Sequence, residues 1–386
     1  MDNHLIWAEV DLNAYAHNIR ELKRITSPDA RLMAVVKADG YGHGAIEVAR
    51  KALQNGAEHL GVARINEAIP LREAGLEAPI LIFGYTPPEL AAQLVDYNLT
   101  QTVYSFSAAK ALSDRVQRER NTIKIHIKVD SGMGRLGIVL DALMKSQAAG
   151  FSPSNPVQTV ASIARLSGLE IEGVFTHFAT SDSADKTYAA KQLTLFMDFL
   201  NELRKESLEF PINHAANSAA LIDLPQSHFD MVRPGIATYG LHPSDEVQTT
   251  HVDLKPVMSL KCKIVHLKKV PAGFNISYGI TYQTTTPTII ATVPAGYADG
   301  FNRLLSNRGH MLVRGQRSPI VGRVCMDLTM LDVGHINDVD INEEVVIFGR
   351  QGTESITADD VAAQLKTINY EIVSTITSRV PRIYLN

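Results

Sequence analysis

The sequence predicts an α/β chain with a (β/α)8 barrel of the TIM type in residues 1–241 and a smaller, mainly β domain in residues 242–386. From Arg31 to Leu241, short apolar runs alternate with helical patterns, which is typical of parallel strands joined by crossover helices. After the turn-rich Pro243–Glu246, apolar and polar residues alternate with period two, which indicates β-strands. The length of 386 residues also exceeds what one hydrophobic core usually serves.

The first part contains eight predicted β/α units. Their strand cores are Leu32–Val36, His59–Ala63, Pro79–Phe83, Thr100–Tyr104, Ile123–Val129, Ile171–Thr176, Pro211–His214, and Met231 with the Ile236–Tyr239 run close behind. Helical spacing of apolar residues follows most strands, for example over Pro88–Tyr97, Ala108–Arg118 and Tyr188–Lys205. A loop is expected at Gly150–Pro156. Eight such units predict a closed barrel whose chemistry lies at the carboxyl ends of the strands.

The second part is predicted to be β-rich and to contain two helices. Its expected strands are Ser259–Val270, Thr288–Pro294, Met311–Arg314, Ile320–Val324, Thr329–Val333 and Val345–Phe348. Its expected helices are Ala358–Leu365 and Tyr370–Ser378.

Composition and charge exclude several classes of function. The net charge of −4 and the lack of basic runs interleaved with aromatics argue against a nucleic-acid partner. No apolar stretch is long enough to span a bilayer, and the N-terminus lacks a secretory pattern, so we expect a cytoplasmic protein. Cys262 and Cys325 are far apart, which favours reduced thiols over a disulfide. No histidine or cysteine spacing indicates a metal site.

Lys37 is the first candidate for chemistry. It ends the first predicted strand and precedes the run Gly40-Tyr41-Gly42-His43-Gly44, which suggests that the backbone approaches a ligand closely. The alternative is a solvated lysine at a strand end. A lysine amine, with an ordinary pKa near 10.4, becomes a useful nucleophile when it is desolvated or placed beside other cations. A barrel mouth provides both conditions.

The run Gly132-Met-Gly134-Arg135-Leu-Gly137 matches the GxGxxG pattern of dinucleotide sites. A dinucleotide site also requires an acidic residue about twenty positions later and an early β/α unit. This run lies in the fifth unit and a neutral stretch follows it, so we predict that its glycines let Arg135 reach inward instead. The chain also lacks a Walker motif.

Further polar residues follow strands six to eight and the turns of the second part. Each of them alone is more simply read as a structural residue, and catalysis by Tyr278 is not indicated by spacing. These residues are His177, Asp182, His214, Asn217, Ser218, Arg233, Gly235 and Ile236 in the first part, and Tyr278, Tyr297, Arg303, Arg323 and Met326 in the second. Ser218 and the Gly235 and Ile236 amides lie where barrels commonly hold phosphate.

The motifs together resemble the alanine racemase family over nearly the whole chain. They are AVVKADGYGHG, VDSGMGRLG, THFATSD, HAANSAA, RPGIATYGL, SYGITY, PAGYADGFNR, GRVCMDLT and TINYE, in the family's order. The resemblance implies a homodimeric, pyridoxal-phosphate-dependent racemase that supplies D-alanine for peptidoglycan. The stretch between Leu136 and Ile171 is longer than is usual in the family.

The resemblance also implies a role for each matching residue. Lys37 would carry the cofactor and act as one acid/base, while Tyr278 from the partner subunit would act as the other. His177 would support Tyr278, Arg233 would face the pyridine nitrogen, and Arg135 and Met326 would bind substrate. The remaining matches are Tyr41, Asn217, Ser218, Gly235, Ile236 and Tyr370 at the cofactor, Asp182, Tyr297, Arg303 and Arg323 at the entrance, and Lys128 as a lysine that some members carbamylate.

These groups suit inversion of an α-carbon, because removal of the α-proton needs an electron sink and inversion needs a base on each face. A tyrosine would need its pKa lowered by roughly 3 units, about 4 kcal/mol, and Arg135 and His177 are suitable neighbours. Three alternatives stay open. They are a serine or broader small-amino-acid racemase, an amino-acid decarboxylase of the same fold, and a non-enzymatic pyridoxal-phosphate carrier.

Overall fold

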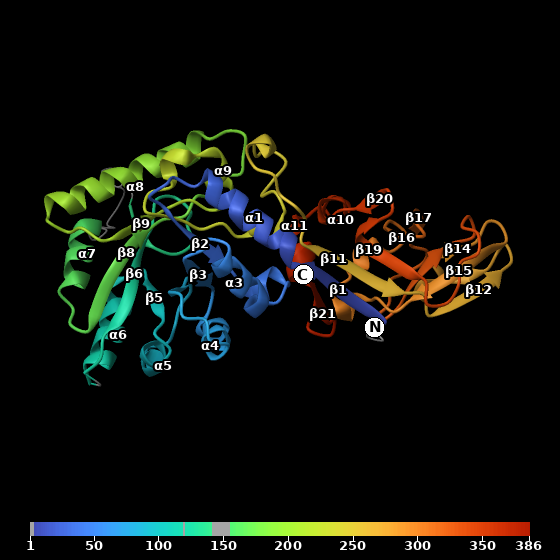
Figure 1. The fold of residues 1–386 in the computed structure, drawn as a ribbon, viewed down its shortest axis with the longest axis horizontal. Helices are drawn as coiled ribbons and strands as arrows, with labels where there is room; N and C mark the ends of the chain where they lie inside the picture. The colour runs from blue at the N-terminus through green and yellow to red at the C-terminus, as the bar shows by residue number, and fades with distance from the viewer. Residues whose placement is uncertain (1–3, 119, 141–154) are drawn as a thin grey trace. The chain divides into compact units, whose positions relative to one another are not determined.

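The computed structural model describes residues 4–118, 120–140 and 155–386. They group into two compact units. The barrel unit comprises Tyr15–Gly40 and Ala45–Lys255, and the β unit comprises Met1–Ala14, Tyr41–Gly44 and Pro256–Asn386 (Figure 1).

The barrel unit is built on parallel strands hydrogen-bonded in the order β10-β2-β3-β4-β5-β6-β8-β9, with β7 beside β6. The strands are β2 (Arg31–Val35), β3 (His59–Val62), β4 (Ile80–Ile82), β5 (Thr100–Val103), β6 (Ile123–Asp130), β7 (Ile138–Val139), β8 (Leu169–Phe175), β9 (Ile212–His214) and β10 (Met231–Val232). The Asp230 N–H donates to the Asn213 carbonyl at 3.0 Å, so backbone bonds also join the segments at the two ends of this order. The predicted fold class is confirmed.

Helices surround these strands (Figure 1). They are α1 (Leu12–Ile25), α2 (Lys37–Tyr41), α3 (Ala45–Gln54), α4 (Ile65–Glu73), α5 (Ala91–Asp96), α6 (Phe106–Arg118), α7 (Pro156–Ala164), α8 (Thr187–Lys205) and α9 (Ser218–Asp223), with 3-10 turns η1 (Pro88–Leu90), η3 (Pro225–Ser227), η4 (Ile236–Tyr239) and η5 (Thr249–His251). In α8, Leu193, Phe196 and Leu203 are buried along one face, as the predicted helical spacing requires. Met33, Leu81, Ile212 and Met231 form a buried cluster among the strands.

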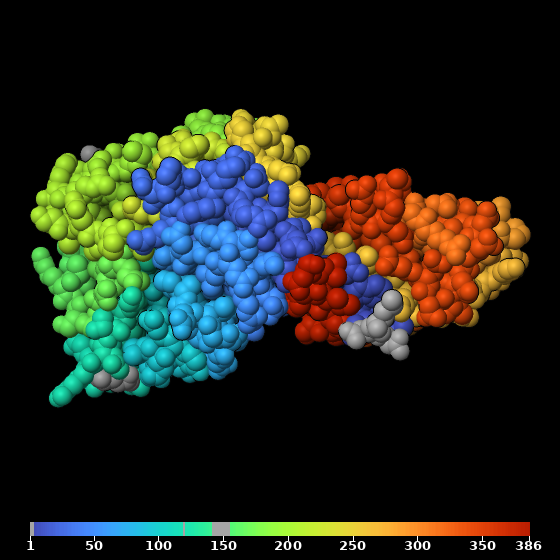
Figure 2. Space-filling view, in the orientation of Figure 1, coloured from blue at the N-terminus to red at the C-terminus, as the bar shows by residue number. Residues whose placement is uncertain are grey.

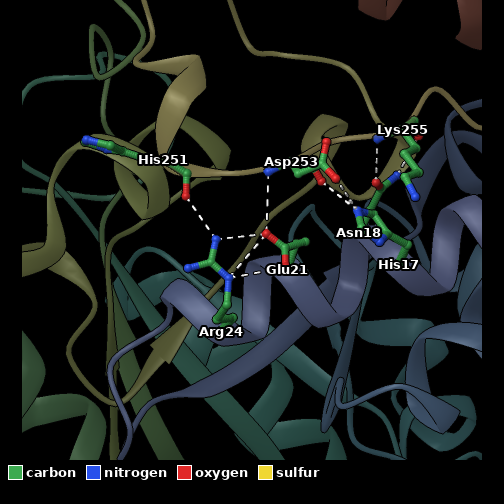
Figure 3. A network of polar contacts seen from close by, with 7 residues as sticks. All are labelled: His17, Asn18, Glu21, Arg24, His251, Asp253 and Lys255. Carbon is green, nitrogen blue, oxygen red and sulfur yellow. Dashed lines mark hydrogen bonds and ion pairs between the residues drawn. The ribbon is translucent and has the colours of Figure 1, made fainter.

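Polar contacts hold the last segment of the barrel unit to α1 (Figure 3). His17 Nε2 lies 2.9 Å from the Asp253 carbonyl oxygen, and the Asn18 side chain donates to the Lys255 carbonyl at 2.8 Å. Arg24 donates to the His251 carbonyl at 3.1 Å. In the space-filling view this yellow segment lies beside the blue surface of α1 (Figure 2). The segment that leaves the barrel is therefore anchored by side chains of α1.

The β unit contains a sheet in the order β17-β16-β19-β11-β1-β21, with β20 beside β19. A three-stranded sheet, β12-β15-β18, and the β13-β14 pair complete its described strands. The elements are β1 (Ile6–Asp11), β11 (Met258–Lys263), β12 (His266–Val270), β13 (Asn275–Ile276), η6 (Tyr278–Ile280), β14 (Tyr282–Gln283), β15 (Thr288–Val293), η7 (Tyr297–Asp299), η8 (Arg303–Leu305), β16 (His310–Val313), β17 (Gln316–Pro319), β18 (Thr329–Asp332), β19 (Glu344–Gln351), β20 (Glu354–Ile356), α10 (Ala358–Leu365), α11 (Asn369–Ser374) and β21 (Arg382–Leu385).

The N-terminal strand belongs to the sheet of the β unit. β1 pairs antiparallel with β11 and parallel with β21, so it lies between strands more than 240 positions later in the sequence. Local periodicity carries no information about such a pairing. The division of the sequence at residues 241 and 242 remains a prediction.

Several predicted segments differ from the elements of the structure. Ser259–Val270 is two strands rather than one, because β11 and β12 belong to different sheets. Ile236–Tyr239 is a 3-10 turn rather than part of a strand, because the chain bends at Gly235 and the Thr238 N–H returns to the Gly235 carbonyl. Most of the loop expected at Gly150–Pro156 lies outside the described residues, and Pro156 begins α7. Ile320–Val324 is not a strand beyond a single bridge at Ile320.

The strand that forms a hairpin with β16 is the more polar β17, and β19 pairs with the other edge of β16. Arg314 and Gly315 both have positive φ, 51° and 70°, which is the geometry of a tight two-residue hairpin turn. The turn sets the register from Val313 with Gln316 to His310 with Pro319. The hydrophobic pattern missed this strand because Gln316 and Arg317 are exposed.

Within the described residues, no helix combines the length and the apolar content that crossing a bilayer requires.

Candidate active site

Lys37 lies two positions after the end of β2 at Val35 and begins α2, whose residues Ala38–Tyr41 form a left-handed turn. The φ angles of Ala38, Asp39, Gly40 and Tyr41 are 52°, 52°, 60° and 51°. Each non-glycine residue in this conformation costs about 1–2 kcal/mol, and such strain concentrates at functional sites. Gly40 has a second reason to be glycine, because an added Cβ would lie 2.8 Å from Val48 Cγ2. Burial, followed by the charge of Arg135, lowers the pKa of the Lys37 amine.

The glycine-rich run that contains Arg135 wraps around the carboxylate of Asp130 at the end of β6. Asp130 Oδ1 accepts from the N–H groups of Gly132, Met133 and Gly134 at 2.9, 2.7 and 3.1 Å, and Oδ2 accepts from the Arg135 N–H at 3.1 Å. The loop amides therefore satisfy a side chain of their own strand. These four amides are occupied by the Asp130 carboxylate and are not presented to a phosphate group.

Arg233 directly follows β10. Its side chain is buried, with the residue 4% exposed, and its hydrogen-bond partners are neutral. It donates to His214 Nδ1 at 2.7 Å and to the carbonyls of Thr176 and Ala215 at 2.9 and 3.0 Å. His214 Nε2 lies 2.8 Å from His126 Nδ1. Because arginine only donates, His214 Nδ1 must accept and its Nε2 must carry the proton that it donates to His126. Arg233 thus fixes the tautomers of both buried histidines.

The barrel side chains form a cationic group. Arg135 lowers the pKa of Lys37, Lys128 and Arg233, in each case after the larger effect of burial. The pKa of Lys128 falls to about 8 and that of Arg233 to about 9, so the guanidinium stays protonated at neutral pH. Burial and then Arg233 hold the pKa of His177 well below its ordinary value. Crowded cations of this kind favour an anionic ligand.

The buried histidines make folding stability depend on pH. Burial lowers the pKa of His126 from 6.5 to about 3, so the unfolded chain binds a proton between these values that the folded chain does not. We expect the free energy of unfolding to fall as pH drops from 6.5 toward 3, by up to about 1.4 kcal/mol per pH unit for this group.

Urea unfolding at several pH values measures this dependence. His126→Asn keeps an acceptor for His214 and should give a shallower pH dependence than the parent, while the same change at the exposed His266 should not. An equal slope in the parent and His126→Asn would contradict the assignment.

The residues expected to hold a phosphate lie together after β9 and β10. Ser218 Oγ accepts from the Gly235 N–H at 2.8 Å, which joins the start of α9 to the start of η4. Asn217 caps α9 by accepting from the Ala220 N–H at 3.0 Å, and the Ser181 hydroxyl donates to the same Asn217 oxygen at 2.9 Å. Helix N-termini and cationic side chains suit a phosphate group, so this donor set is compatible with pyridoxal phosphate.

The β unit presents the predicted second base on a strained turn. Tyr278 is 72% exposed and is preceded by Ser277, whose φ of 64° and ψ of −177° are rarely adopted by residues other than glycine. The Ser277 hydroxyl donates to the Arg323 carbonyl at 2.6 Å. A Cβ on Gly279 would lie 3.3 Å from Arg323 Cζ, so the Arg323 guanidinium lies against this turn.

Four other predicted residues of the β unit lie in two pairs, Tyr297 with Met326 and Tyr41 with Tyr370. Tyr297 and Met326 are brought together because the Tyr297 N–H donates to the Cys325 carbonyl and the Ala298 N–H donates to the Met326 carbonyl, at 3.1 and 3.0 Å. Gly296 allows this approach, since a Cβ there would lie 2.1 Å from the Met326 carbonyl oxygen. The rings of Tyr41 and Tyr370 lie 6.2 Å apart. Arg303 begins η8 with an exposed side chain, and Asp182 is half-buried in the barrel unit.

Sequence reasoning assigned no role to Asp130, His126 or Glu67. Asp130 lies within a quoted motif, but only the folded loop shows that its carboxylate organises the following amides. Glu67 accepts from the N–H groups of Ala38, Ala63 and Arg64. A Ser or Thr three residues before Glu67 would have signalled a capping box, but Arg64 occupies that position. No group of three His, Cys, Asp or Glu in the described part of the chain could hold a metal ion.

A β/α barrel with a desolvated lysine, clustered cations and phosphate-compatible helix N-termini at its strand ends defines a class of barrel enzymes suited to pyridoxal phosphate. The family model described as alanine racemase, N-terminal domain, matches residues 10–243, and the one described as alanine racemase, C-terminal domain, matches residues 257–384. The chain belongs to the alanine racemase family, whose members depend on pyridoxal phosphate.

Individual relatives agree over the full length. An alanine racemase of Desulfosudis oleivorans is 54% identical, covering 100% of this chain and 98% of the relative, and one of Methanococcus maripaludis is 46% identical over 100% of both. The structure of an alanine racemase from Clostridium difficile 630 has a TM-score of 0.92 and 38% identity, covering 100% and 97% of the two chains. That of Bacillus anthracis with bound L-Ala-P has a TM-score of 0.91, 38% identity and coverage of 100% and 96%.

Proposed function

We propose that the protein interconverts L-alanine and D-alanine, with pyridoxal phosphate carried by Lys37 and with Lys37 and Tyr278 as the two proton-transferring groups. The observation that carries this proposal is the lysine amine at the end of β2, whose pKa is lowered by burial and by Arg135. A lowered pKa increases the share of the lysine that is in the neutral, nucleophilic form at a given pH. Family membership supports the same activity.

Different residues of the chain would hold the cofactor, transfer protons and bind the substrate. When bound, pyridoxal phosphate supplies the electron sink that lets an α-proton leave. Lys37 would hold the cofactor and move a proton on one face, and Tyr278 would move a proton on the other. Arg135, with the Met326 backbone, would bind the substrate carboxylate, and the narrow entrance expected from Asp182, Tyr297, Arg303 and Arg323 favours a small side chain. The phosphate would be held by Ser218, which follows the α9 cap residue Asn217, and by the amides of Gly235 and Ile236.

Three further assignments stay predictions. Tyr41 and Tyr370 would add hydroxyl groups to the phosphate site, and His177 would support Tyr278. Lys128, buried on β6 with a lowered pKa, is the position that some family members carbamylate. A neutral amine is the form that reacts with carbon dioxide, and the lowered pKa supports this assignment.

Arg233 would suppress a side reaction. A protonated guanidinium facing the pyridine nitrogen donates to it and leaves that nitrogen without a proton, which weakens the electron sink and favours rapid return of the α-proton. We expect Arg233→Glu to increase the pyruvate formed from alanine by about tenfold or more per racemisation event, a difference of about 1.4 kcal/mol between the two outcomes. Pyruvate is measured with lactate dehydrogenase. Pyruvate formation equal to that of the parent would contradict this role.

The catalytic assembly would be a homodimer in which Tyr278 of one chain serves the barrel of the other, in the cytoplasm. The exposure of the Tyr278 side chain supports this arrangement, because a catalytic phenol must be covered by some surface before it can be desolvated. The family is typically dimeric.

Purified protein supplied with pyridoxal phosphate tests the proposal. We expect a yellow protein that removes the optical rotation of L-alanine faster than that of L-serine, and that leaves L-lysine unchanged. Faster loss with L-serine would indicate the broader racemase, and release of carbon dioxide from a diamino acid would indicate a decarboxylase. A yellow but inactive protein would indicate a carrier, and a colourless, inactive protein would overturn the proposal.

A further inference from the structure

The carboxylate of Glu67 holds the peptide bond that directly follows Lys37. Glu67 Oε1 accepts from the Ala38 N–H at 2.8 Å. The other oxygen, Oε2, accepts from the Ala63 N–H at 2.7 Å and from the Arg64 N–H at 3.1 Å. One side chain therefore ties the end of β2 to the start of α4, after the neighbouring strand β3.

The chemistry of this contact calls for a carboxylate. The N–H groups lie on two sides of the Glu67 head group, and only an ionised carboxyl group offers an acceptor on both sides. A glutamine would turn its NH2 group toward one side and set donor against donor. Helix N-termini also favour negative charge, and Glu67 lies in the first turn of α4.

The contact also lies where the backbone is most strained. Ala38 is the first of the left-handed residues that separate Lys37 from the rest of the chain. The Asp39 side chain accepts from the Ala45 N–H, and the Gly40 N–H donates to the Val36 carbonyl, both at 2.8 Å, so the turn is held at its later residues as well. The contact from Glu67 is made to the peptide group that follows Lys37, and the one from Gly40 is made to the peptide group that precedes it.

We propose that Glu67 is a positioning residue for Lys37: it holds the left-handed turn so that the Lys37 amine is presented in one direction to the carbonyl group that it attacks. This inference rests on the proposed function, in which that carbonyl is the aldehyde of pyridoxal phosphate. Glu67 also acts through charge, since its carboxylate raises the pKa of Lys37 and partly opposes burial and Arg135.

The test compares Glu67→Gln with Asp360→Asn. Asp360 is a matched control, because it caps α10 from the same position and accepts from the Thr357 N–H at 2.8 Å. Cofactor-free protein is mixed with pyridoxal phosphate and reduced with borohydride, and the modified Lys37 peptide is quantified by mass spectrometry over time and over pH. The plateau rate at alkaline pH, where the amine is neutral in every variant, reports positioning. The midpoint of the pH profile reports charge.

We expect Glu67→Gln to lower the plateau rate at least fivefold and to move the midpoint to lower pH, while Asp360→Asn changes neither. Ala38→Gly should restore at least half of the loss, because glycine adopts a positive φ without penalty and needs no clamp. If Glu67→Gln does not fold, Ala38→Gly is compared with the double variant that carries Ala38→Gly and Glu67→Gln. The double variant should have a plateau rate less than fivefold below that of Ala38→Gly, because a glycine at position 38 adopts the positive φ without the contact from Glu67.

An unchanged plateau rate of Lys37 modification in Glu67→Gln would overturn the inference, and so would a loss of that rate that Ala38→Gly does not restore. Glu67 would then be a helix cap only. The proposed function fails in a different way, because the parent protein itself would then show no modification at Lys37.

Discussion

A mixture of Lys37→Ala and Tyr278→Ala proteins is expected to regain activity that neither protein has alone. Each variant should lose more than about 10³-fold in kcat/KM, because each lacks a proton-transferring group in both of its sites. If Tyr278 serves the partner's barrel, a hybrid dimer contains one site with both groups and one with neither. Equal amounts that exchange freely form hybrids as half of all dimers, so about a quarter of the parental activity should return.

The measurement is the rate of D-alanine formation before and after mild denaturant is used to exchange subunits. Mixing without exchange is the first control. The second is an exchanged mixture of Lys37→Ala with a Lys37→Ala, Tyr278→Ala double variant, which cannot form a complete site. Size-exclusion chromatography confirms that dimers are present. Exchange without recovery would show that the two groups do not meet across an interface.

Tyr278→Phe is expected to separate proton removal from inversion. The ring remains to pack, but the hydroxyl that moves a proton is gone, so racemisation should fall by about 10²–10⁴-fold. Lys37 still acts on its own face. In deuterated water we therefore expect one enantiomer of alanine to exchange its α-hydrogen while keeping its configuration, and the other to exchange much more slowly.

Proton NMR of the α-hydrogen, with each enantiomer in a separate tube, measures this effect. Tyr282→Phe, four positions later on β14, is the matched control and should racemise like the parent. Equal exchange of both enantiomers by Tyr278→Phe would contradict a role for Tyr278 on a single face.

Much of the molecule was predictable because the information is local. Apolar runs of strand length and helical spacing over segments such as Ala358–Leu365 report burial on one face, and the structure confirms that helix residue for residue. Lys37, Arg135 and Arg233 could be placed at strand ends because in a barrel the carboxyl ends of all strands lie on one face.

Other features depend on contacts that no local pattern encodes. β1 joins the sheet of the β unit through partners at β11 and β21, and β17 is selected by a two-residue turn rather than by apolar residues. Neither pairing leaves a periodicity in its own segment. Sequence-based prediction therefore missed both strands, while it located helices such as α8 and α10 and most of the parallel strands of the barrel unit.

By itself, the sequence determined the barrel class, the family motifs and the cations at the strand ends, because each depends on residue type and spacing along the chain. Only the tertiary structure decided which backbone groups the carboxylates of Asp130 and Glu67 hold, and which tautomers Arg233 imposes on His214 and His126. Hydrogen bonds act over about 3 Å in space, so residues that are distant in sequence become partners only after the chain has folded.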